Sequence, residues 1–244
     1  MSLTFFSRCE GATHDGTHDY SAGDTTSAAG TYGTTQVRVG TNSAGAPDGG
    51  DFGPRYSNGD PATIVIANEA KIGFWYYPTA FAQDNRIFNV RSAASYTQMV
   101  AIDFRGSSGS GNLRLRILED DGNATTLDTS GANLATGNWY FVVAAWDAAG
   151  PRRRIAVYDT SMTLIAENTS TASFTAPSNL TDASGNYLVF GPFGQGGTGY
   201  VDNIFVADDF DEDIESYSEI TSYTEYGAAA GLPKSLGLLL RGCG

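Results

Sequence analysis

The chain is poor in cysteine and histidine, two residue types that often serve in nucleophilic catalysis and in transition-metal binding. Its 244 residues include two cysteines, Cys9 and Cys243, and two histidines, His14 and His18. A nucleophilic triad needs a histidine beside a serine or cysteine, but both histidines fall in one short polar segment. The sequence therefore argues against such a triad. Two cysteines are also too few for a disulfide framework, and whether these two pair with each other is left open.

Basic residues are also scarce, because the formal net charge is −13 and the only lysines are Lys71 and Lys234. A surface of this sign repels phosphate backbones and anionic lipid head groups. No stretch approaches the roughly 20 apolar residues that span a bilayer. We therefore expect no nucleic-acid partner and no membrane insertion.

The first residues, 1–8, have neither a basic stretch nor a long apolar run, so no signal peptide is visible. Either an export leader has been removed, or the protein is made and assembled in a cytoplasm, as a phage structural protein is. Both alternatives suit an acidic protein on a virion or an extracellular surface.

What the chain does contain is typical of an all-β protein. Glycine is abundant, with 30 residues, and the 41% hydrophobic content is enough for a sizeable core. Short apolar or alternating segments recur about every ten residues with turn residues between them, which indicates a sandwich or barrel. The expected strands are 3–7, 35–39, 62–67, 71–77, 86–91, 96–105, 112–118, a short strand after the turn at 120–123, 138–147, 152–159, 162–167, 187–191 and 198–207, and 208–220 has the one helical pattern.

Two motifs resemble the concanavalin A-like or laminin G-like jelly-roll family. They are the hairpin of 137–159, with G-N-W-Y-F-V-V, a turn at Gly150 and Pro151 and then R-I-A-V-Y-D, and the closing segment G-Y-V-D-N-I of 199–204. The resemblance covers about residues 60–220. It implies an antiparallel two-sheet jelly-roll sandwich with one short helix near the C-terminus, the first and last strands side by side, and Trp139 packed between the sheets.

The chain is expected to form one sandwich, 1–226, with long N-terminal loops in the polar region 10–60, followed by an apolar segment at 227–244. Leu236, Leu238, Leu239 and Leu240 make that last segment too hydrophobic for a free tail. It is expected to be either a final strand of the same domain or an assembly arm that docks on a neighbouring subunit of a homo-oligomer.

A structural calcium ion is a further implication of the family resemblance. By order and context, Glu10 and Asp202 match an early carboxylate and the aspartate of the last strand, and Asp15 is a further acidic candidate near Glu10. Calcium takes six to eight oxygen ligands, which carboxylates and loop carbonyls supply. The alternative is that these residues only form turns. A zinc site at His14 and His18 is disfavoured, since that spacing needs a helix and glycine and threonine surround it.

Four side chains are candidates to contact a glycan or a partner protein. Alternation in 73–78 places Phe74 and Tyr76 on one strand face and Trp75 and Tyr77 on the other, and exposed rings suit sugars and subunits alike. Packing of all four rings in a core is the alternative. In 112–118, Arg114 and Arg116 lie opposite the leucines and could meet an acidic sugar.

The expected function is a non-catalytic surface interaction module, either a virion protein (capsid decoration or tail accessory) or an adhesin, with a glycan as a candidate ligand. Glycosidases of similar fold carry paired carboxylates on one inward-facing strand, and the nearest match, Asp211–Glu215, falls in the helical pattern as a solvated acidic face. No catalytic residue is therefore assigned. The alternatives are a polysaccharide hydrolase or lyase, and a purely structural shell or filament subunit.

Overall fold

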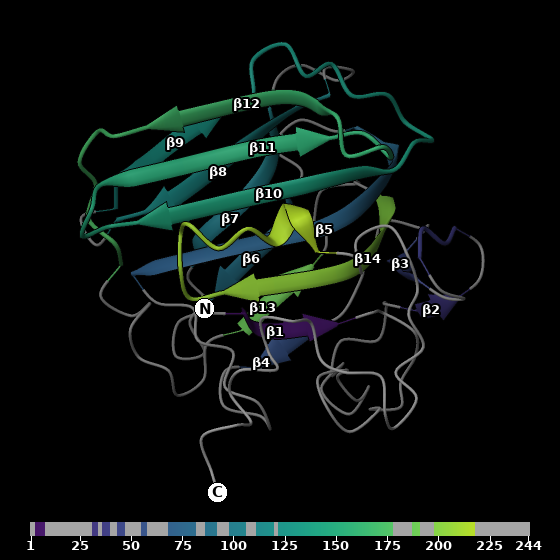
Figure 1. Ribbon diagram of the computed structural model, residues 1–244, viewed down its shortest axis with the longest axis horizontal. Coiled ribbons are helices and arrows are strands. Elements are labelled where there is room, and N and C mark those ends of the chain that lie inside the picture. Colours follow the sequence, from purple (N-terminus) through teal and green to yellow (C-terminus); the bar gives the residue numbers. More distant parts are fainter. Residues whose placement is uncertain are drawn as a thin grey trace, which may run out of the picture.

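The computed structural model describes residues 3–7, 31–33, 36–39, 43–46, 55–57, 68–81, 86–91, 98–105, 111–119, 122–177, 187–190 and 198–217. These residues form two antiparallel β-sheets stacked face to face, with the eight-stranded sheet in front and the six-stranded sheet behind it in Figure 1. The expected fold class, an all-β two-sheet jelly-roll sandwich, is confirmed.

The eight-stranded sheet has the order β12-β11-β10-β5-β14-β3-β2, and β1 pairs with β14 beside this path. The long strand β5 is central, because β10 and β14 flank it on either side. The strands are β1 (Leu3–Ser7), β2 (Thr31–Gly33), β3 (Ser43–Ala46), β5 (Glu69–Ala80), β10 (Tyr140–Asp147), β11 (Arg152–Tyr158), β12 (Leu164–Ser170) and β14 (Thr198–Ala207).

The six-stranded sheet has the order β4-β13-β6-β7-β8-β9, and every pairing in it is antiparallel. Its strands are β4 (Arg55–Ser57), β6 (Arg86–Arg91), β7 (Gln98–Arg105), β8 (Asn112–Leu118), β9 (Ala124–Asp128) and β13 (Tyr187–Phe190). The sheet therefore draws its strands from both halves of the chain.

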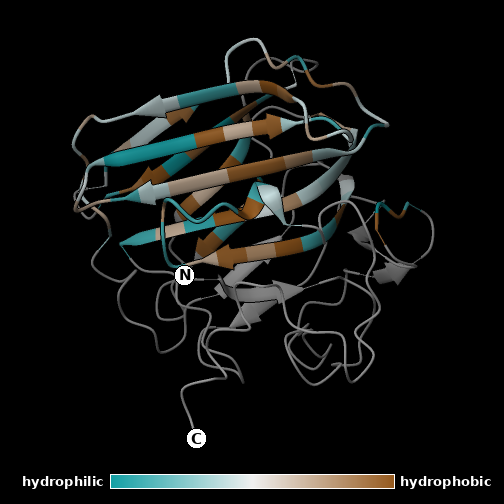
Figure 2. Ribbon diagram, viewed as in Figure 1, coloured by the Kyte–Doolittle hydropathy of each residue, from teal (hydrophilic) through white to brown (hydrophobic). Residues whose placement is uncertain are grey.

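The main core fills the space between the two sheets. Its largest fully buried members include Phe74 and Tyr76 from β5, Phe88 from β6, Phe104 from β7 and Trp146 from β10. Figure 2 shows the hydrophobic stretches of β10 and β14 in the middle of the front sheet. Burial of these side chains at about 25 cal/mol per Å² of apolar area is the main stabilising contribution to the sandwich.

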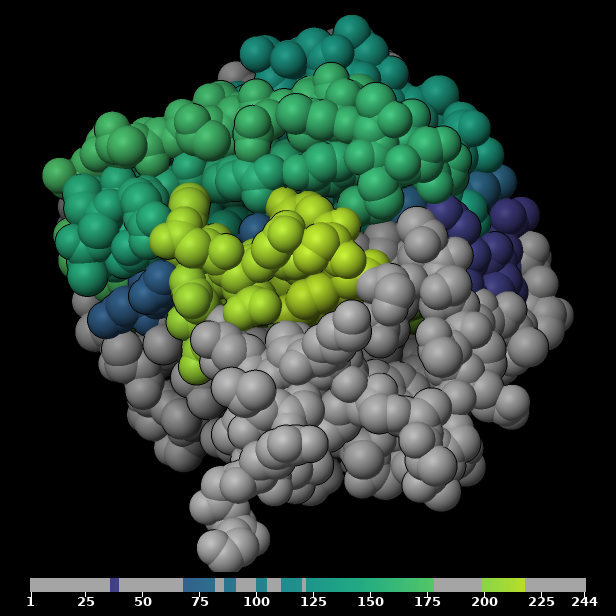
Figure 3. Space-filling model, viewed as in Figure 1, coloured from purple at the N-terminus to yellow at the C-terminus, as the bar shows by residue number. Residues whose placement is uncertain are grey.

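The middle of the eight-stranded sheet is also covered on its outer face. A second apolar cluster there contains Trp75, Phe141, Phe205 and Ile214, with Val39 from a loop. Residues 208–217 lie across this face after β14 (Figure 3) and contain a single 3₁₀ turn, η3 (Ile214–Ser216). Because both faces of the sheet are covered, every residue of β10 is buried.

Most of the expected strands match the structure closely. Strands β1, β6, β8 and β14 have the expected bounds, and the short helix near the C-terminus is the η3 turn. The strand expected at 35–39 is wrong, because 36–39 form bends that cover the outer face of the sheet. Strands β2, β3 and β4 were not expected at all, since each has only three or four residues.

The chain closes as the jelly-roll prediction requires, because β1 and β14 pair directly. The strand expected at 62–67, both cysteines, both histidines and the apolar segment 227–244 lie outside the described residues. No helix within the described ranges is long and apolar enough to cross a membrane.

Candidate functional site

Arginine side chains gather on the outer face of the six-stranded sheet. In β8 the burial alternates at every position, with Leu113, Leu115 and Ile117 buried and Arg114 and Arg116 half-buried. The expected separation of leucines and arginines onto two faces of this strand is therefore confirmed. The leucine face joins the main core, so the arginine face is the outer one.

A buried aspartate on the neighbouring strand holds one of these arginines. Asp103 of β7 lies 3.1 Å from Arg116 Nη2 through its Oδ2 atom, and 3.6 Å from Arg86 Nε of β6 through its Oδ1 atom. Arg116 reaches Asp103 diagonally, because its direct partner in the pairing register is the short residue Ala101. The Asp103 side chain is 3% exposed, whereas Arg86 and Arg116 are 27% and 28% exposed.

The third arginine pairs toward the edge of the sheet. Arg114 Nε donates a hydrogen bond of 2.9 Å to Asp128 Oδ1 on β9. We call Arg86, Arg114 and Arg116, with Asp103 and Asp128, the arginine face. These five residues carry a net charge of +1 in a chain whose formal charge is −13. Asp103 is buried, but Asp128 is 33% exposed against 15% for its partner Arg114, so the positive charge that reaches the solvent is that of Arg86 and Arg116.

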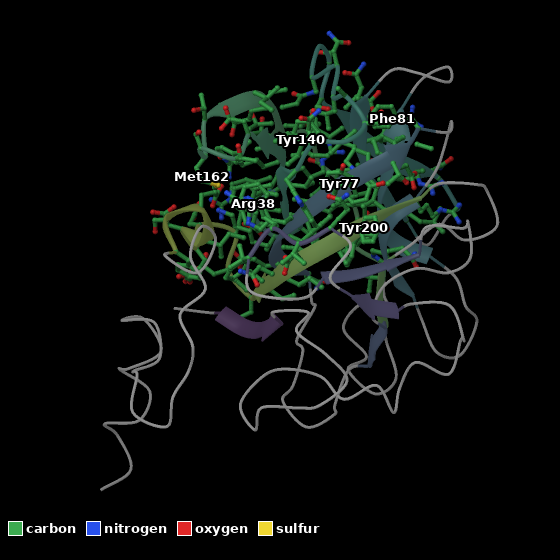
Figure 4. All side chains as sticks on the ribbon, turned by 90° about the vertical axis from the view of Figure 1, so that its right-hand side faces the viewer. Arg38, Tyr77, Phe81, Tyr140, Met162 and Tyr200 are labelled. Carbon is green, nitrogen blue, oxygen red and sulfur yellow. The ribbon has the colours of Figure 1, made fainter. Side chains whose placement is uncertain are left out.

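A row of aromatic rings occupies part of the opposite outer surface, on the eight-stranded sheet. Tyr77 of β5 is the partner of Tyr200 of β14 in the register, with ring centroids 6.1 Å apart. On its other side Tyr77 lies 5.4 Å from the ring of Trp139, which precedes β10. All three are half-buried, and Figure 4 labels the two tyrosines on their adjacent strands. We call these three residues the aromatic row.

Trp75 and Tyr77 share one face of β5 as expected, and this is the outer face of the sheet, but the two rings differ in burial. The Trp75 ring is fully buried, in edge contact with Phe141 and beneath Arg38, whose Cζ atom lies 4.3 Å from the ring centroid. A ring without exposed surface cannot stack on a ligand, so Trp75 is a residue of the outer core. The expectation that Trp139 packs between the sheets is wrong, because this side chain packs on the outer cluster and is only half-buried.

Asp202 is buried and holds a loop in place. Its Oδ2 atom accepts hydrogen bonds of 3.0 Å from the backbone N–H groups of Arg38 and Val39, and its Oδ1 atom accepts one of 2.8 Å from the N–H of Asn203. The other expected calcium ligands, Glu10 and Asp15, lie outside the described residues. Among the residues that the structure does describe, no cluster of three potential metal ligands occurs. The calcium site stays a prediction.

The acidic stretch near the C-terminus is bound to the sheet by ion pairs. Glu215 Oε2 lies 2.7 Å from Lys71 Nζ, and Glu215 Oε1 accepts a hydrogen bond from Arg154 Nη1. Asp211 pairs with Arg152 Nη1 at 2.9 Å. The expectation that this stretch is a solvated acidic face is wrong for Glu215, since its side chain is 14% exposed. These carboxylates fasten residues 208–217 over the outer cluster.

Sequence reasoning found two members of the arginine face, Arg114 and Arg116, and missed the other three. The missed residues Arg86, Asp103 and Asp128 belong to different strands, and only the pairing register brings them together. Alternation within β7 and β9 is a signal for the facing of Asp103 and Asp128, but it does not identify their partners. The leucines proposed as an assembly arm, Leu236, Leu238, Leu239 and Leu240, lie outside the described residues.

Comparison with known proteins shows which fold this chain shares with them but assigns it to no family. No protein-family model matches the sequence, and no curated protein matches it. Among solved structures, the chain is similar to the Ruminococcus gnavus IT-sialidase CBM40 bound to α2,3-sialyllactose, with a TM-score of 0.50 at 15% identity over 74% of this chain and 96% of that one.

Two further structures share the architecture with similar scores. The binding domain of Paraclostridial Mosquitocidal Protein 1 has a TM-score of 0.50 at 12% identity, over 90% of this chain and 51% of that one. The enzymatically active domain of bacteriophage CBA120 tailspike protein 2 has a TM-score of 0.51 at 12% identity, over 84% of this chain and 28% of that one. At such identities the similarity shows a shared jelly-roll type of β-sandwich and nothing finer.

Proposed function

We propose that this protein is a glycan-binding surface module that recognises an acidic sugar at the arginine face. The observation that carries the proposal is the arrangement of Arg86 and Arg116 on either side of the buried Asp103. The carboxylate pairs with both guanidinium groups, more closely with that of Arg116, and both arginine side chains stay partly open to solvent. Arginine presents a planar fork of donors that matches a carboxylate, so a sugar acid is the ligand class that fits.

The charge of the whole chain sets the expected character of this binding. A net charge of −13 repels anions at long range, so an acidic sugar gains attraction only where the arginines outnumber the aspartates. Such contacts are partly screened by salt and compete with Asp103 and Asp128 for the same donors. We therefore expect affinity for a single acidic sugar to be modest and to weaken as ionic strength rises.

The solved structures support the choice of ligand class. One of the similar chains is a carbohydrate-binding module bound to sialyllactose, and sialic acid carries the carboxylate that the arginine face fits. Two of the three compared structures are named as binding domains or modules, which favours binding over catalysis. The similarity to a tailspike domain described as enzymatically active supports the alternative, a polysaccharide hydrolase.

The proposal also includes the location of the protein, which is the surface of a virion or an extracellular surface. A phage tailspike among the similar structures favours a virion setting, and an adhesin on an extracellular surface is the alternative. In either setting, assembly into a homo-oligomer would raise a modest affinity for one sugar through multivalency. A calcium ion at Glu10, Asp15 and Asp202 belongs to the proposal as a structural element and not as part of the sugar contact.

A glycan array tests the proposal directly. The array should include sialylated, uronate-containing and neutral glycans, and it should be probed with wild-type protein and with the Arg116→Gln variant, each with and without EDTA. We expect the wild-type protein to bind acidic glycans and the Arg116→Gln variant to lose this binding. EDTA should weaken binding only if a calcium ion stabilises the fold. Binding to no acidic glycan, or equal binding by the variant, would refute recognition at the arginine face.

A further inference from the structure

The aromatic row differs from the rest of the outer face of the eight-stranded sheet. Two residues farther along the same strands, on the same face, lie Trp75, Phe141 and Asp202. They are buried beneath residues 36–39 and 208–217. Tyr200, Tyr77 and Trp139 lie beyond that cover and are half-buried. The sheet therefore has one end where aromatic rings pack as a core and one end where equivalent rings keep exposed surface.

The three rings are tilted and do not form one flat surface. Tyr77 makes an interplanar angle of 56° with Trp139 and of 70° with Tyr200. Tyr77 and Tyr200 therefore meet edge to face, whereas Tyr77 and Trp139 are tilted, and both contacts support the rings. These contacts hold the orientation of each ring while part of its surface stays exposed, so the row offers pre-oriented aromatic surface at low entropic cost to a ligand.

Polar groups border the row on the side of Trp139. Residues 135–138 are all exposed, and Gly137 donates its backbone N–H to the Pro78 carbonyl at 2.8 Å, which places this turn beside Tyr77. Gly137 has φ 79°, and a Cβ atom there would stand 3.6 Å from the Tyr77 hydroxyl. A side chain at this position would therefore contact that hydroxyl, and glycine leaves this contact out. Thr136 and Asn138 add a hydroxyl and an amide next to Trp139.

Charge distinguishes this surface from the arginine face. The segments that build it, 77–81, 134–141 and 199–201, contain no charged residue. The nearest carboxylate in sequence is that of Asp202, which is buried and bonded to backbone amides. Aromatic rings beside neutral hydrogen-bonding groups suit a ligand with an apolar face and hydroxyl edges, and an uncharged pyranose ring has both.

We infer that the aromatic row is a second carbohydrate site, which takes an uncharged pyranose and is independent of the arginine face. The inference rests on the proposed glycan-binding role of the chain but not on its acidic ligand. The two sites lie on the outer surfaces of opposite sheets, so one domain can hold two sugars at once. The apolar face of a pyranose stacks on Trp139 or Tyr77, and its hydroxyl groups bond to Thr136, Asn138 and the tyrosine hydroxyls.

Tryptophan fluorescence gives a specific test, because the chain has three tryptophans and the other two, Trp75 and Trp146, are fully buried. Lactose, cellotetraose and maltotetraose should each be titrated into wild-type protein. We expect at least one to change the emission and to protect it from quenching by acrylamide. Trp139→Phe should remove the signal, while saturation-transfer NMR should still detect the sugar bound to the variant.

Tyr200→Ala supplies a second variant on another strand, and it should weaken the same sugar about tenfold or more. Arg116→Gln is the matched control and should bind the neutral sugar as the wild type does. Absence of binding by all three sugars, or unchanged binding by Tyr200→Ala, would overturn the inference. A wild-type dimer that Tyr200→Ala converts to a monomer would overturn it too, since the row would then be a subunit contact.

The outcomes also separate this inference from the proposed function. Binding of sialyllactose without any binding of the three neutral sugars leaves the arginine face standing and removes the second site. If a neutral sugar binds, Tyr200→Ala loses that binding and no acidic glycan binds, the aromatic row stands as a carbohydrate site and recognition at the arginine face is removed.

Discussion

Oδ2 of Asp202 accepts a hydrogen bond of 3.0 Å from the backbone N–H of Val39, a residue 163 positions earlier in the chain. The same oxygen accepts the N–H of Arg38, and both residues belong to the loop that covers Trp75. One buried carboxylate therefore fixes the cover of the outer core. It also defines where the covered part of the sheet ends and the aromatic row begins.

Replacement of this carboxylate should destabilise the fold. Asp202→Ala leaves the N–H groups of Arg38, Val39 and Asn203 without their acceptor, so we expect the free energy of unfolding to fall by about 2–4 kcal/mol. Urea denaturation followed by circular dichroism measures the change. Asp213→Ala is the control, because Asp213 is exposed and its side chain caps nothing. A loss below about 0.5 kcal/mol for Asp202→Ala would contradict the anchoring role.

Stability should depend on pH through Glu215. Burial alone would raise the pKa of this carboxyl group, but hydrogen bonds and charge from Lys71 and Arg154 outweigh burial and hold the pKa below its ordinary value of 4.5. A lowered pKa in the folded state gives stability that is fully present above about pH 5 and is lost as the pH falls through the folded value. We expect the free energy of unfolding to decrease on acidification from pH 5 to pH 3.

Glu215→Gln should reduce this acid-dependent loss and should lower stability by about 3 kcal/mol at pH 7, because Lys71 remains buried without a carboxylate partner. Urea titrations at several pH values compare the two proteins. Some dependence should persist through Asp147, whose pKa is lowered by the hydrogen bond from the Gly150 N–H and by Arg152, against the opposing effect of burial. The same acid-dependent loss in both proteins would show that Glu215 does not contribute.

Packing under the η3 turn should not tolerate a methyl group at Gly73. A Cβ atom there would lie 2.6 Å from Ile214 Cδ1 and 2.8 Å from Phe141 Cζ, closer than carbon atoms pack. We expect Gly73→Ala to cost about 1–3 kcal/mol, measured by thermal unfolding. Ile214→Val removes the Cδ1 atom, so the double variant should be less destabilised than the sum of the single variants. Strict additivity would mean that the turn does not pack on Gly73.

Much of the sandwich follows from the sequence because its strands are local patterns. Arg114 and Arg116 alternate with leucines, so the face on which each residue of β8 lies needed no distant information. Trp75 could not be assigned from its own strand, because the cover over its ring comes from Arg38 and from residues after β14. Asp103 was missed for a related reason, since its arginine partners lie on the two neighbouring strands.

Isothermal titration with α2,3-sialyllactose and with lactose tests recognition by the arginine face most directly, since the two ligands share the neutral disaccharide and differ in the acidic sugar. We expect wild-type protein to bind sialyllactose about tenfold more tightly than lactose, a difference of about 1.4 kcal/mol, and Arg116→Gln to bring that ratio close to one. An unchanged ratio in the variant, or no preference in the wild type, would contradict the assignment.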